Sequence, residues 1–189
     1  MNEIIVGIDE AGRAPLAGRV YAAAVILKPE SSIIGLNDSK KIPQKTRELL
    51  YNEIIKKSLA YGIGFAETDE IESINILQAT FLAMKRALEK IDHNFHKVLV
   101  DGNIYPFKND YHGEAIIKGD TKIPEIMAAS ILAKVDRDNY MFDMDRLYPD
   151  YQFAKHKGYP TKLHRDLIKK HGPSPIHRRS FKGVKEFII

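Results

Sequence analysis

The chain has 189 residues, of which 44% are hydrophobic, which is enough for one domain with a proper core. It contains no cysteine, so disulfides, thiolate zinc sites and thiol nucleophiles are excluded, and a reducing cytoplasm is the expected setting. The net charge is +4, the longest apolar run (residues 20–27) is too short to cross a membrane, and early charged residues argue against a signal peptide.

Apolar periodicity predicts an α/β chain. Residues 3–9 are apolar on both faces, as in a central strand, and residues 18–27 are expected to pair with them. Further strands are predicted at residues 61–66, 97–101 and 115–118, and helices at residues 42–58, 75–91, 124–147 and 161–170. Thr161 is the expected N-cap of the last helix and Gly172 its stop. Strands and helices interleave after the opening strand pair, which favours a mixed sheet flanked by helices.

Positive charge is concentrated at the C-terminal end. Residues 155–189 contain ten Lys and Arg against two acids, a balance of +8, so the preceding residues carry −4. Such a basic segment can bind the backbone of a polyanion, or it can simply face solvent. We expect a core over residues 1–150 and a small basic helical segment over residues 151–189 packed on it, within a single domain.

Four acids follow or end the predicted strands: Asp9, Glu10, Asp101 and Asp120. Strand ends in α/β sheets are where ligand sites collect. Carboxylates that crowd together repel one another unless a divalent cation lies between them, so a shared site would most simply bind Mg²⁺ or Mn²⁺. Adjacent strand residues point to opposite faces, so Asp9 and Glu10 can share a site only if the strand ends or twists there.

Each acid also has a purely structural explanation. Asp120 could cap a helix, Asp101 could form a turn before Gly102, and Glu10 could be an ordinary surface charge. Periodicity by itself does not decide between these explanations and a metal site.

Several motifs occur together in this chain in a recognisable order. They lie at residues 9–18 (DEAGRAPLAG), 36–40 (LNDSK), 100–102 (VDG), 118–120 (KGD), 128–135 (AASILAKV) and 156–159 (HKGY). In order and spacing these motifs resemble the ribonuclease HII family, from about residue 4 to residue 181. The resemblance implies a ribonuclease H-like fold with a small helical C-terminal part. It also implies cleavage of the RNA strand of RNA–DNA hybrids and incision at single ribonucleotides in duplex DNA.

The resemblance assigns catalytic and metal-binding roles to Asp9, Glu10, Asp101 and Asp120, with Mg²⁺ or Mn²⁺ as cofactor. Two such ions roughly 3.5–4 Å apart can activate a water and stabilise the leaving oxygen, so no protein nucleophile is required. The expected products carry a 3′-hydroxyl and a 5′-phosphate, with the cut on the 5′ side of the embedded ribonucleotide.

The turn Gly12, Arg13, Ala14 resembles the Gly-Arg-Gly segment of the family, which contacts the 2′-hydroxyl and phosphate of the ribonucleotide. A rigid turn of backbone donors is a sensible reader of the 2′-hydroxyl, the group that separates RNA from DNA. Position 14 is Ala where the family has Gly. If that site needed a positive φ or a close backbone approach, the Cβ would cost about 1 kcal/mol or more and weaken reading of the 2′-hydroxyl. Arg19 stands where Pro is usual.

The same resemblance implies further substrate contacts. Tyr159 resembles the tyrosine that packs on the sugar at the RNA-to-DNA junction, although it could instead fasten the C-terminal segment to the core. Ser39 and Lys40 resemble phosphate contacts, although Ser39 could belong to a helix cap. Residues 177–181 resemble the closing motif of the family and are expected to add positive charge for the DNA strand.

Two other functions remain open from the sequence. One is a non-catalytic nucleic-acid-binding module, and the other is a nuclease that cuts only hybrids, as the related ribonuclease HIII family does. The expected partners are RNA–DNA hybrids and ribonucleotide-containing duplex DNA, with no membrane. Nothing in the sequence demands more than a monomer, and a protein partner such as a sliding clamp cannot be read from it.

Overall fold

The computed structural model describes residues 3–29, 32–36 and 42–188, and its centre is a five-stranded mixed sheet. The strands are β1 (Ile5–Ala11), β2 (Val20–Leu27), β3 (Ser58–Ala66), β4 (Lys97–Asp101) and β5 (Gly113–Ile116), in the order β3-β2-β1-β4-β5. β2 is antiparallel to β1 and β3, whereas β4 is parallel to β1 and β5. The predicted mixed α/β architecture is therefore confirmed.

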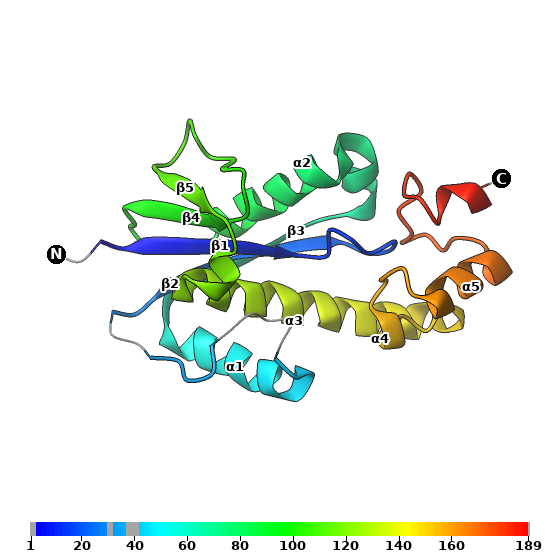
Figure 1. Cartoon of the computed structure of the whole chain (residues 1–189), viewed down its shortest axis with the longest axis horizontal. Coiled ribbons are helices and arrows are strands. Elements are labelled where there is room, and N and C mark those ends of the chain that lie inside the picture. Colours follow the sequence, from blue (N-terminus) through cyan, green and yellow to red (C-terminus); the bar gives the residue numbers. More distant parts are fainter. Residues whose placement is uncertain (1–2, 30–31, 37–41, 189) are drawn as a thin grey trace.

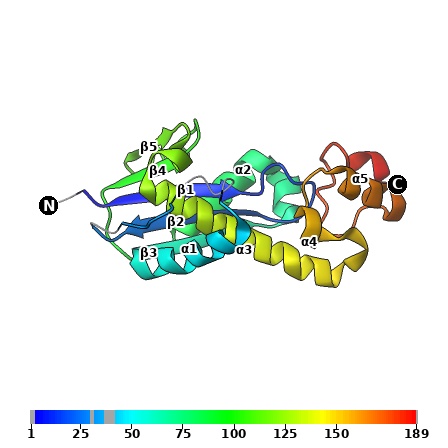
Figure 2. The ribbon, with the colours of Figure 1, turned by 60° about the horizontal axis from the view of Figure 1, so that its bottom comes forward.

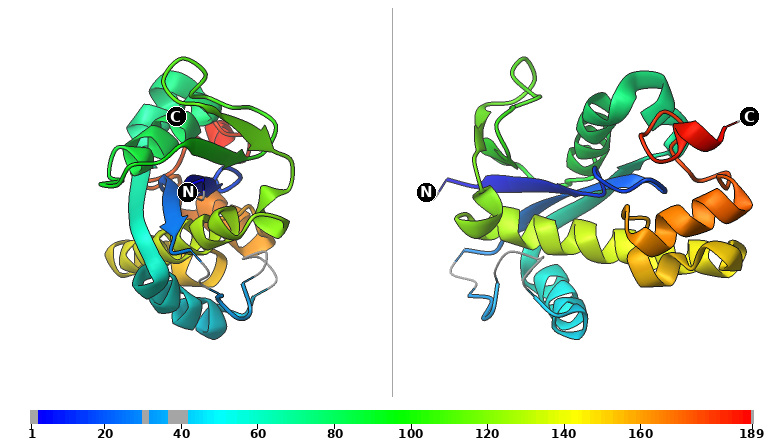
Figure 3. Two further views of the ribbon diagram at one scale, coloured as in Figure 1. Left: turned by 90° about the vertical axis from the view of Figure 1, so that its left-hand side faces the viewer. Right: turned by 45° about the vertical axis from the view of Figure 1, so that its right-hand side comes forward.

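Helices cover both faces of this sheet (Figure 1). Helix α2 (Thr68–Leu88) lies on one face, and α1 (Gln44–Lys57) and α3 (Pro124–Leu147) lie on the other. The end-on view in Figure 3 shows the same three layers. The short helices α4 (Phe153–His156) and α5 (Lys162–His171) lie with the C-terminus beyond one end of the sheet, beside the last turns of α3 (Figure 2). Within the described ranges, no helix is long and apolar enough to cross a membrane.

The hydrophobic core is split by the sheet into two main clusters. Every side chain of β2 is buried, and alternate residues enter opposite clusters: Ala24 packs toward α2, whereas Ala23 and Val25 pack toward α3. Val6 and Ile8 of β1 belong to the α2 cluster, so Gly7 and Asp9 face α3. This alternation decides which residues of β1 can meet α3.

Helix α3 lies unusually close to β1 because Gly7 has no side chain. A Cβ atom on Gly7 would lie 2.3 Å from the carbonyl carbon of Glu125 and 2.4 Å from the backbone nitrogen of Ile126. The first turn of α3 therefore rests directly on the strand backbone. Ser130 follows on the same helix and comes close to Asp9.

Several element boundaries differ from the predicted ones. β1 continues to Ala11 instead of ending at Asp9, and β5 begins at Gly113, two residues before the predicted start. Helix α2 begins at Thr68, after a capping box formed by Glu67 and Glu70, whereas periodicity placed its start at residue 75. Asn75 interrupts the helix with φ of 67°, so the predicted start coincides with this break.

Other boundaries agree with the predictions. α3 has the predicted bounds, and the Thr161 side chain accepts a hydrogen bond from the backbone N–H of His164, as an N-cap does. Gly172 ends α5. The division of the chain at residue 150 stays a prediction.

Three buried histidines organise the C-terminal segment, a cluster that the sequence analysis did not predict. The rings of His156 and His164 stack with centroids 4.1 Å apart, and Nε2 of His164 lies 2.9 Å from Nε2 of His177. Phe153 packs against all three. Burial, then the neighbouring imidazole, lowers the pKa of His164 to about 4 and that of His177 to about 3, so the cluster is neutral at pH 7.

Replacement of Gly7 tests how closely α3 approaches β1. We expect Gly7→Ala to lower the free energy of unfolding by about 3 kcal/mol, because the new methyl group overlaps the backbone of α3. The control is Gly35→Ala, where the space is open but φ is +85°, so only about 1 kcal/mol of conformational cost is expected. Urea denaturation gives both values; equal losses would contradict the close approach.

The histidine cluster predicts a loss of stability in acid. An unfolded chain protonates these side chains near pH 6.5, whereas the folded chain resists protonation down to about pH 4 or 3, so stability falls as the pH drops through this window. We expect His177→Asn, which cannot titrate, to reduce the loss between pH 7 and pH 4.5 by about 2 kcal/mol. Urea unfolding at both pH values measures it. An unchanged loss in His177→Asn would refute the assignment.

Candidate active site

Three aspartates from separate segments meet on the α3 face of the sheet. β1 and β4 run parallel with Ile8 opposite Val100, so the next residues, Asp9 and Asp101, are neighbours on the opposite face from that pair. Asp120 lies in the short 3₁₀ helix Gly119–Thr121 that follows β5. One carboxylate oxygen from each aspartate lies within 4.8 Å of the other two.

The turn after β5 brings Asp120 to this place. Oδ1 of Asp101 accepts hydrogen bonds from the backbone N–H groups of Gly119 (2.7 Å) and Asp120 (3.3 Å). A Cβ on Gly119 would lie 2.6 Å from Cδ1 of Ile126, so a larger residue there would force this side chain to shift. Asp120 is therefore not the N-cap of α3, a position that Ile123 occupies. Asp101 does hold a turn, but the turn it holds is the one that carries Asp120.

Asp9 is the most enclosed of the three, with 5% of its surface exposed. Its Oδ1 accepts a hydrogen bond from the backbone N–H of Glu10 at 2.7 Å, and it also hydrogen-bonds the Ser130 side chain. Burial, and then the charges of Glu10 and Asp101, hold the pKa of Asp9 well above its usual value. A divalent cation would offset this repulsion, and an all-oxygen donor set suits a hard cation such as Mg²⁺ or Mn²⁺.

Glu10 lies beside this group but is not one of the three that converge within 4.8 Å. The strand continues through Glu10, which pairs with Ala22 of β2, so the alternation of faces persists. Its carboxylate lies 3.4 Å from the guanidinium of Arg13. The strand does not end at Asp9, and the role of Glu10 as a metal ligand stays a prediction.

A cleft of about 540 Å³ opens next to the aspartates. Its lining comes from the end of β1, the turn that follows, α2, α3 and the C-terminal segment: Glu10, Ala11, Gly12, Arg13, Ala14, Ile76, Ser130, Lys134 and Tyr159. The structure thus brings together four of the six predicted substrate-binding residues. The other two, Ser39 and Lys40, lie outside the described residues.

The turn after β1 requires glycine at position 12 but not at position 14. Gly12 has φ of +102°, and a Cβ there would lie 2.2 Å from Nε of Arg137. Ala14 is not among the residues with positive φ, so the conformational cost of Ala at this position does not arise, and a cost from close approach of the substrate stays a prediction. Arg19, the second departure from the family pattern, forms a salt bridge with Glu67 at 2.5 Å and lies over the ring of Phe65.

Ser130 and Lys134 lie in the motif at residues 128–135, but the sequence alone assigned no role to either. They are four residues apart on α3, so they share a helix face, and that spacing was the available signal. Lys134 Nζ lies 2.6 Å from Oδ1 of Asp138 and 5.6 Å from the ring centroid of Tyr159. Tyr159 keeps 37% of its surface exposed, so its ring is available in the cleft.

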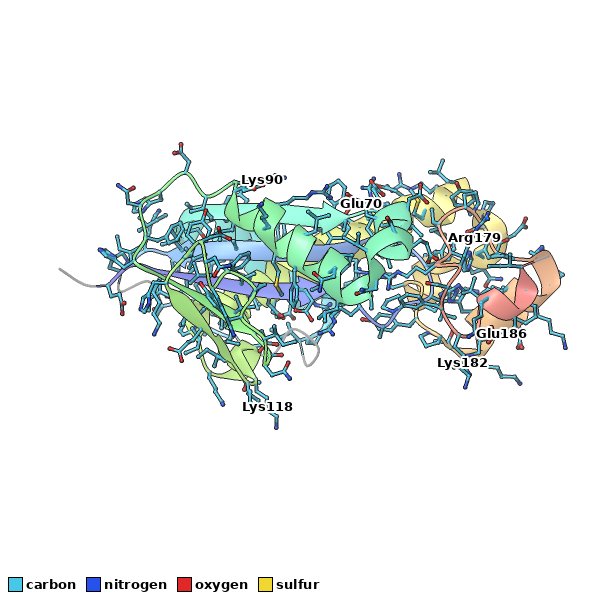
Figure 4. The ribbon with its side chains drawn as sticks, turned by 90° about the horizontal axis from the view of Figure 1, so that it is seen from above. Glu70, Lys90, Lys118, Arg179, Lys182 and Glu186 are labelled. Carbon is cyan, nitrogen blue, oxygen red and sulfur yellow. The ribbon has the colours of Figure 1, made fainter. Side chains whose placement is uncertain are left out.

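The closing motif at residues 177–181 contributes less surface charge than expected. Arg178 is fully buried and donates hydrogen bonds to backbone carbonyls of the loop after β1, so it adds no surface charge for a DNA strand. The neighbouring Arg179 is exposed, with Lys182, at the C-terminal end of the molecule, whereas Lys118 lies toward the opposite end (Figure 4).

Comparison with known proteins agrees with this geometry. The family model described as Ribonuclease HII matches residues 6–184. The ribonuclease HII of Francisella tularensis subsp. tularensis (strain WY96-3418) is 56% identical over 182 residues, covering 96% of this chain and 97% of the relative.

Solved structures share the fold over nearly the whole chain. The crystal structure of the ribonuclease H2 from Pyrococcus horikoshii OT3 matches with a TM-score of 0.80 and 25% identity, covering 97% of this chain and 96% of that one. The structure of the PCNA:RNase HII complex from Archaeoglobus fulgidus contains a chain that matches with a TM-score of 0.77 and 25% identity, covering 95% of both chains. This chain therefore belongs to the ribonuclease HII family, and its fold carries three grouped aspartates with a cleft beside them.

Proposed function

We propose that this protein is a metal-dependent endoribonuclease. It cleaves the RNA strand of RNA–DNA hybrids and nicks duplex DNA on the 5′ side of embedded ribonucleotides. The observation that carries the proposal is the convergence of Asp9, Asp101 and Asp120 within 4.8 Å beside a cleft, in a chain that belongs to the ribonuclease HII family.

The three aspartates would hold Mg²⁺ or Mn²⁺, with Glu10 as a fourth ligand at the edge of the cleft. A two-ion site, when loaded, supplies a nucleophilic water and stabilises the leaving oxygen, which gives 3′-hydroxyl and 5′-phosphate ends. The protein contributes position: Asp101 is held by the turn that carries Asp120, and Asp9 is held by its bonds to the Glu10 backbone and Ser130. No side chain has to act as nucleophile.

Substrate binding is assigned to the cleft and the basic C-terminal segment. The turn Gly12, Arg13, Ala14 would read the 2′-hydroxyl and its phosphate, and Tyr159 would pack against the sugar at the junction. Ser39 and Lys40 would bind phosphate. Eight of the ten Lys and Arg in residues 155–189 are exposed and available to the nucleic acid backbone: Lys155, Lys162, Arg165, Lys169, Lys170, Arg179, Lys182 and Lys185.

The setting follows from the substrate. A protein that acts on hybrids and on ribonucleotides in duplex DNA is expected in the compartment that holds the chromosome, which is the cytoplasm of a bacterium. The Archaeoglobus fulgidus relative was solved in complex with PCNA. That likeness is the sole support for a clamp-like partner here, and the proposed activity needs a monomer only.

The activity is tested with two duplexes, one carrying a single ribonucleotide in DNA and one an RNA–DNA hybrid, each in Mg²⁺ and in Mn²⁺. We expect cuts in both duplexes with 3′-hydroxyl and 5′-phosphate ends, mapped on a sequencing gel, and no cuts in EDTA. Asp101→Asn should slow cleavage at least about 100-fold, which corresponds to ~2.7 kcal/mol of lost transition-state stabilisation.

The same assay separates the alternatives. Binding without any cutting in either metal would indicate the non-catalytic module, and cutting of the hybrid alone would indicate a hybrid-specific nuclease. Cyclic 2′,3′-phosphate ends would exclude water attack and with it the two-ion reaction.

Metal binding can be measured apart from cleavage by titrating Mn²⁺ into the protein in a calorimeter. We expect Asp101→Asn to weaken Mn²⁺ binding at least about 10-fold, because it removes one of the three converging carboxylates. Glu10→Gln should weaken it less. The control is Glu114→Gln on β5. The Glu114 carboxylate lies 2.6 Å from Nζ of Lys97 and is not one of the three that converge. Equal Mn²⁺ affinity in the wild type and Asp101→Asn would refute the site.

A further inference from the structure

Arg178 has no part in the proposed reaction and lies outside the cleft lining. Its guanidinium has no exposed surface and lies beneath the loop that joins β1 to β2. Within the described part of the chain, this side chain donates hydrogen bonds only to backbone carbonyls of that loop: those of Gly12 (2.6 Å), Pro15 (2.8 Å), Arg13 (2.9 Å), Gly18 (3.0 Å) and Arg19 (3.3 Å).

The backbone around Arg178 holds the same loop. The N–H of Arg178 donates to the carbonyl of Leu16 at 2.8 Å, and the N–H of Gly18 donates to the carbonyl of Ile176 at 2.8 Å. An isolated antiparallel bridge pairs Ala17 with His177. The C-terminal segment therefore fixes the position of the loop, and the guanidinium then fixes the orientation of its peptide groups.

The direction of those peptide groups has a consequence for the cleft. In a trans peptide, the C=O of one residue and the N–H of the next point in opposite directions. The carbonyls of Gly12 and Arg13 point at Arg178, so the N–H groups of Arg13 and Ala14 point away from it. Neither N–H has a hydrogen-bond partner among the residues that the structure describes, and both residues line the cleft. Two adjacent free donors of this kind form a small anion- or hydroxyl-binding nest.

Only an arginine suits the position below the turn. A planar guanidinium presents five N–H donors in a fixed fork, whereas a lysine presents one rotating ammonium group. Burial, and then the charge of Arg137, lowers the pKa of Arg178 to about 9, and the surrounding carbonyl dipoles offset the cost of the buried charge. Arg137 itself donates to the carbonyls of Ala17 and Lys157, which ties the same loop to the segment that carries Tyr159.

We propose that Arg178 is a positioning residue for ribonucleotide recognition, which rests on the proposed function. By drawing the carbonyls of Gly12 and Arg13 inward, its guanidinium aims the N–H groups of Arg13 and Ala14 at the 2′-hydroxyl and adjoining phosphate of the substrate. The C-terminal segment thus contributes to specificity from beneath the turn, without contacting the nucleic acid through this side chain.

The test compares the wild type with Arg178→Lys, which keeps the charge but loses the fork, and with the exposed neighbour Arg179→Lys as control. Fluorescence anisotropy in EDTA gives the Kd for a duplex with one ribonucleotide and for the same duplex made entirely of DNA. We expect Arg178→Lys to reduce the preference for the ribonucleotide duplex roughly tenfold, the equivalent of one hydrogen bond in the site. Arg179→Lys should weaken binding to both duplexes equally and leave the preference unchanged.

A purely structural role for Arg178 predicts a different result. In that case Arg178→Lys would lose stability but keep the preference between duplexes, and this outcome overturns the proposal. Mn²⁺ affinity provides a second readout, because it should stay within about twofold of the wild type if only the turn has changed. If the wild type neither binds nor cuts the ribonucleotide duplex, the proposed function itself is contradicted. If the wild type cuts this duplex but Arg178→Lys keeps the full preference for it, only this inference is contradicted.

If Arg178→Lys does not fold, NMR of the wild type still tests whether the N–H groups of Arg13 and Ala14 contact the ribonucleotide. In a ¹⁵N-labelled sample, the amide resonances of Arg13 and Ala14 should exchange rapidly with solvent and shift on addition of the ribonucleotide duplex in EDTA. They should shift much less with the all-DNA duplex. Equal shifts with both duplexes, or slow exchange in the free protein, would overturn the proposal.

Discussion

The parallel pairing of β1 with β4 is the constraint on which the site depends. With Ile8 opposite Val100, the next residue on each strand is an aspartate, and the two carboxylates are placed side by side on the α3 face. A shift of one residue in either strand would move one aspartate to the other face of the sheet. The hydrophobic residues on the α2 face therefore fix the register that the acids require, since Val6, Ile8 and Val100 must all enter the same core cluster.

Holding these carboxylates close together is electrostatically unfavourable, and the packing of the fold offsets this repulsion. Asp9 is held among other carboxylates with almost no exposed surface, and its pKa is raised because the ionised form is disfavoured there. The fold keeps it in place through the register of β1 and the close approach of α3 at Gly7. Strain of this kind is common where a protein is built to receive a cation, because the cation turns the repulsion into attraction.

Positive charge is buried close to these acids in space, although it comes from distant parts of the sequence. Arg178 and Arg137 lie under the loop after β1, where both donate hydrogen bonds to backbone carbonyls. The aspartates and the buried arginines therefore lie on either side of the same short stretch, which runs from Asp9 through Gly12 to Ala14. Asp9, at one end of this stretch, belongs to the candidate metal centre. Gly12 to Ala14, at the other end, form the turn proposed to bind the 2′-hydroxyl. The sheet and the C-terminal segment together therefore fix the distance between the metal centre and this turn.

Much of this protein was determined by local sequence. The strands, the bounds of α3, the cap and stop of α5 and the candidate acids all follow from patterns within a few residues, because hydrophobic periodicity and capping act over one or two turns. Contacts between distant residues decided the rest. The continuation of β1 through Glu10 depended on its pairing with β2, and the burial of Arg178 depended on a loop some 160 residues away. No local pattern distinguishes a buried arginine from an exposed one, since the difference lies in which carbonyls the folded chain brings around it.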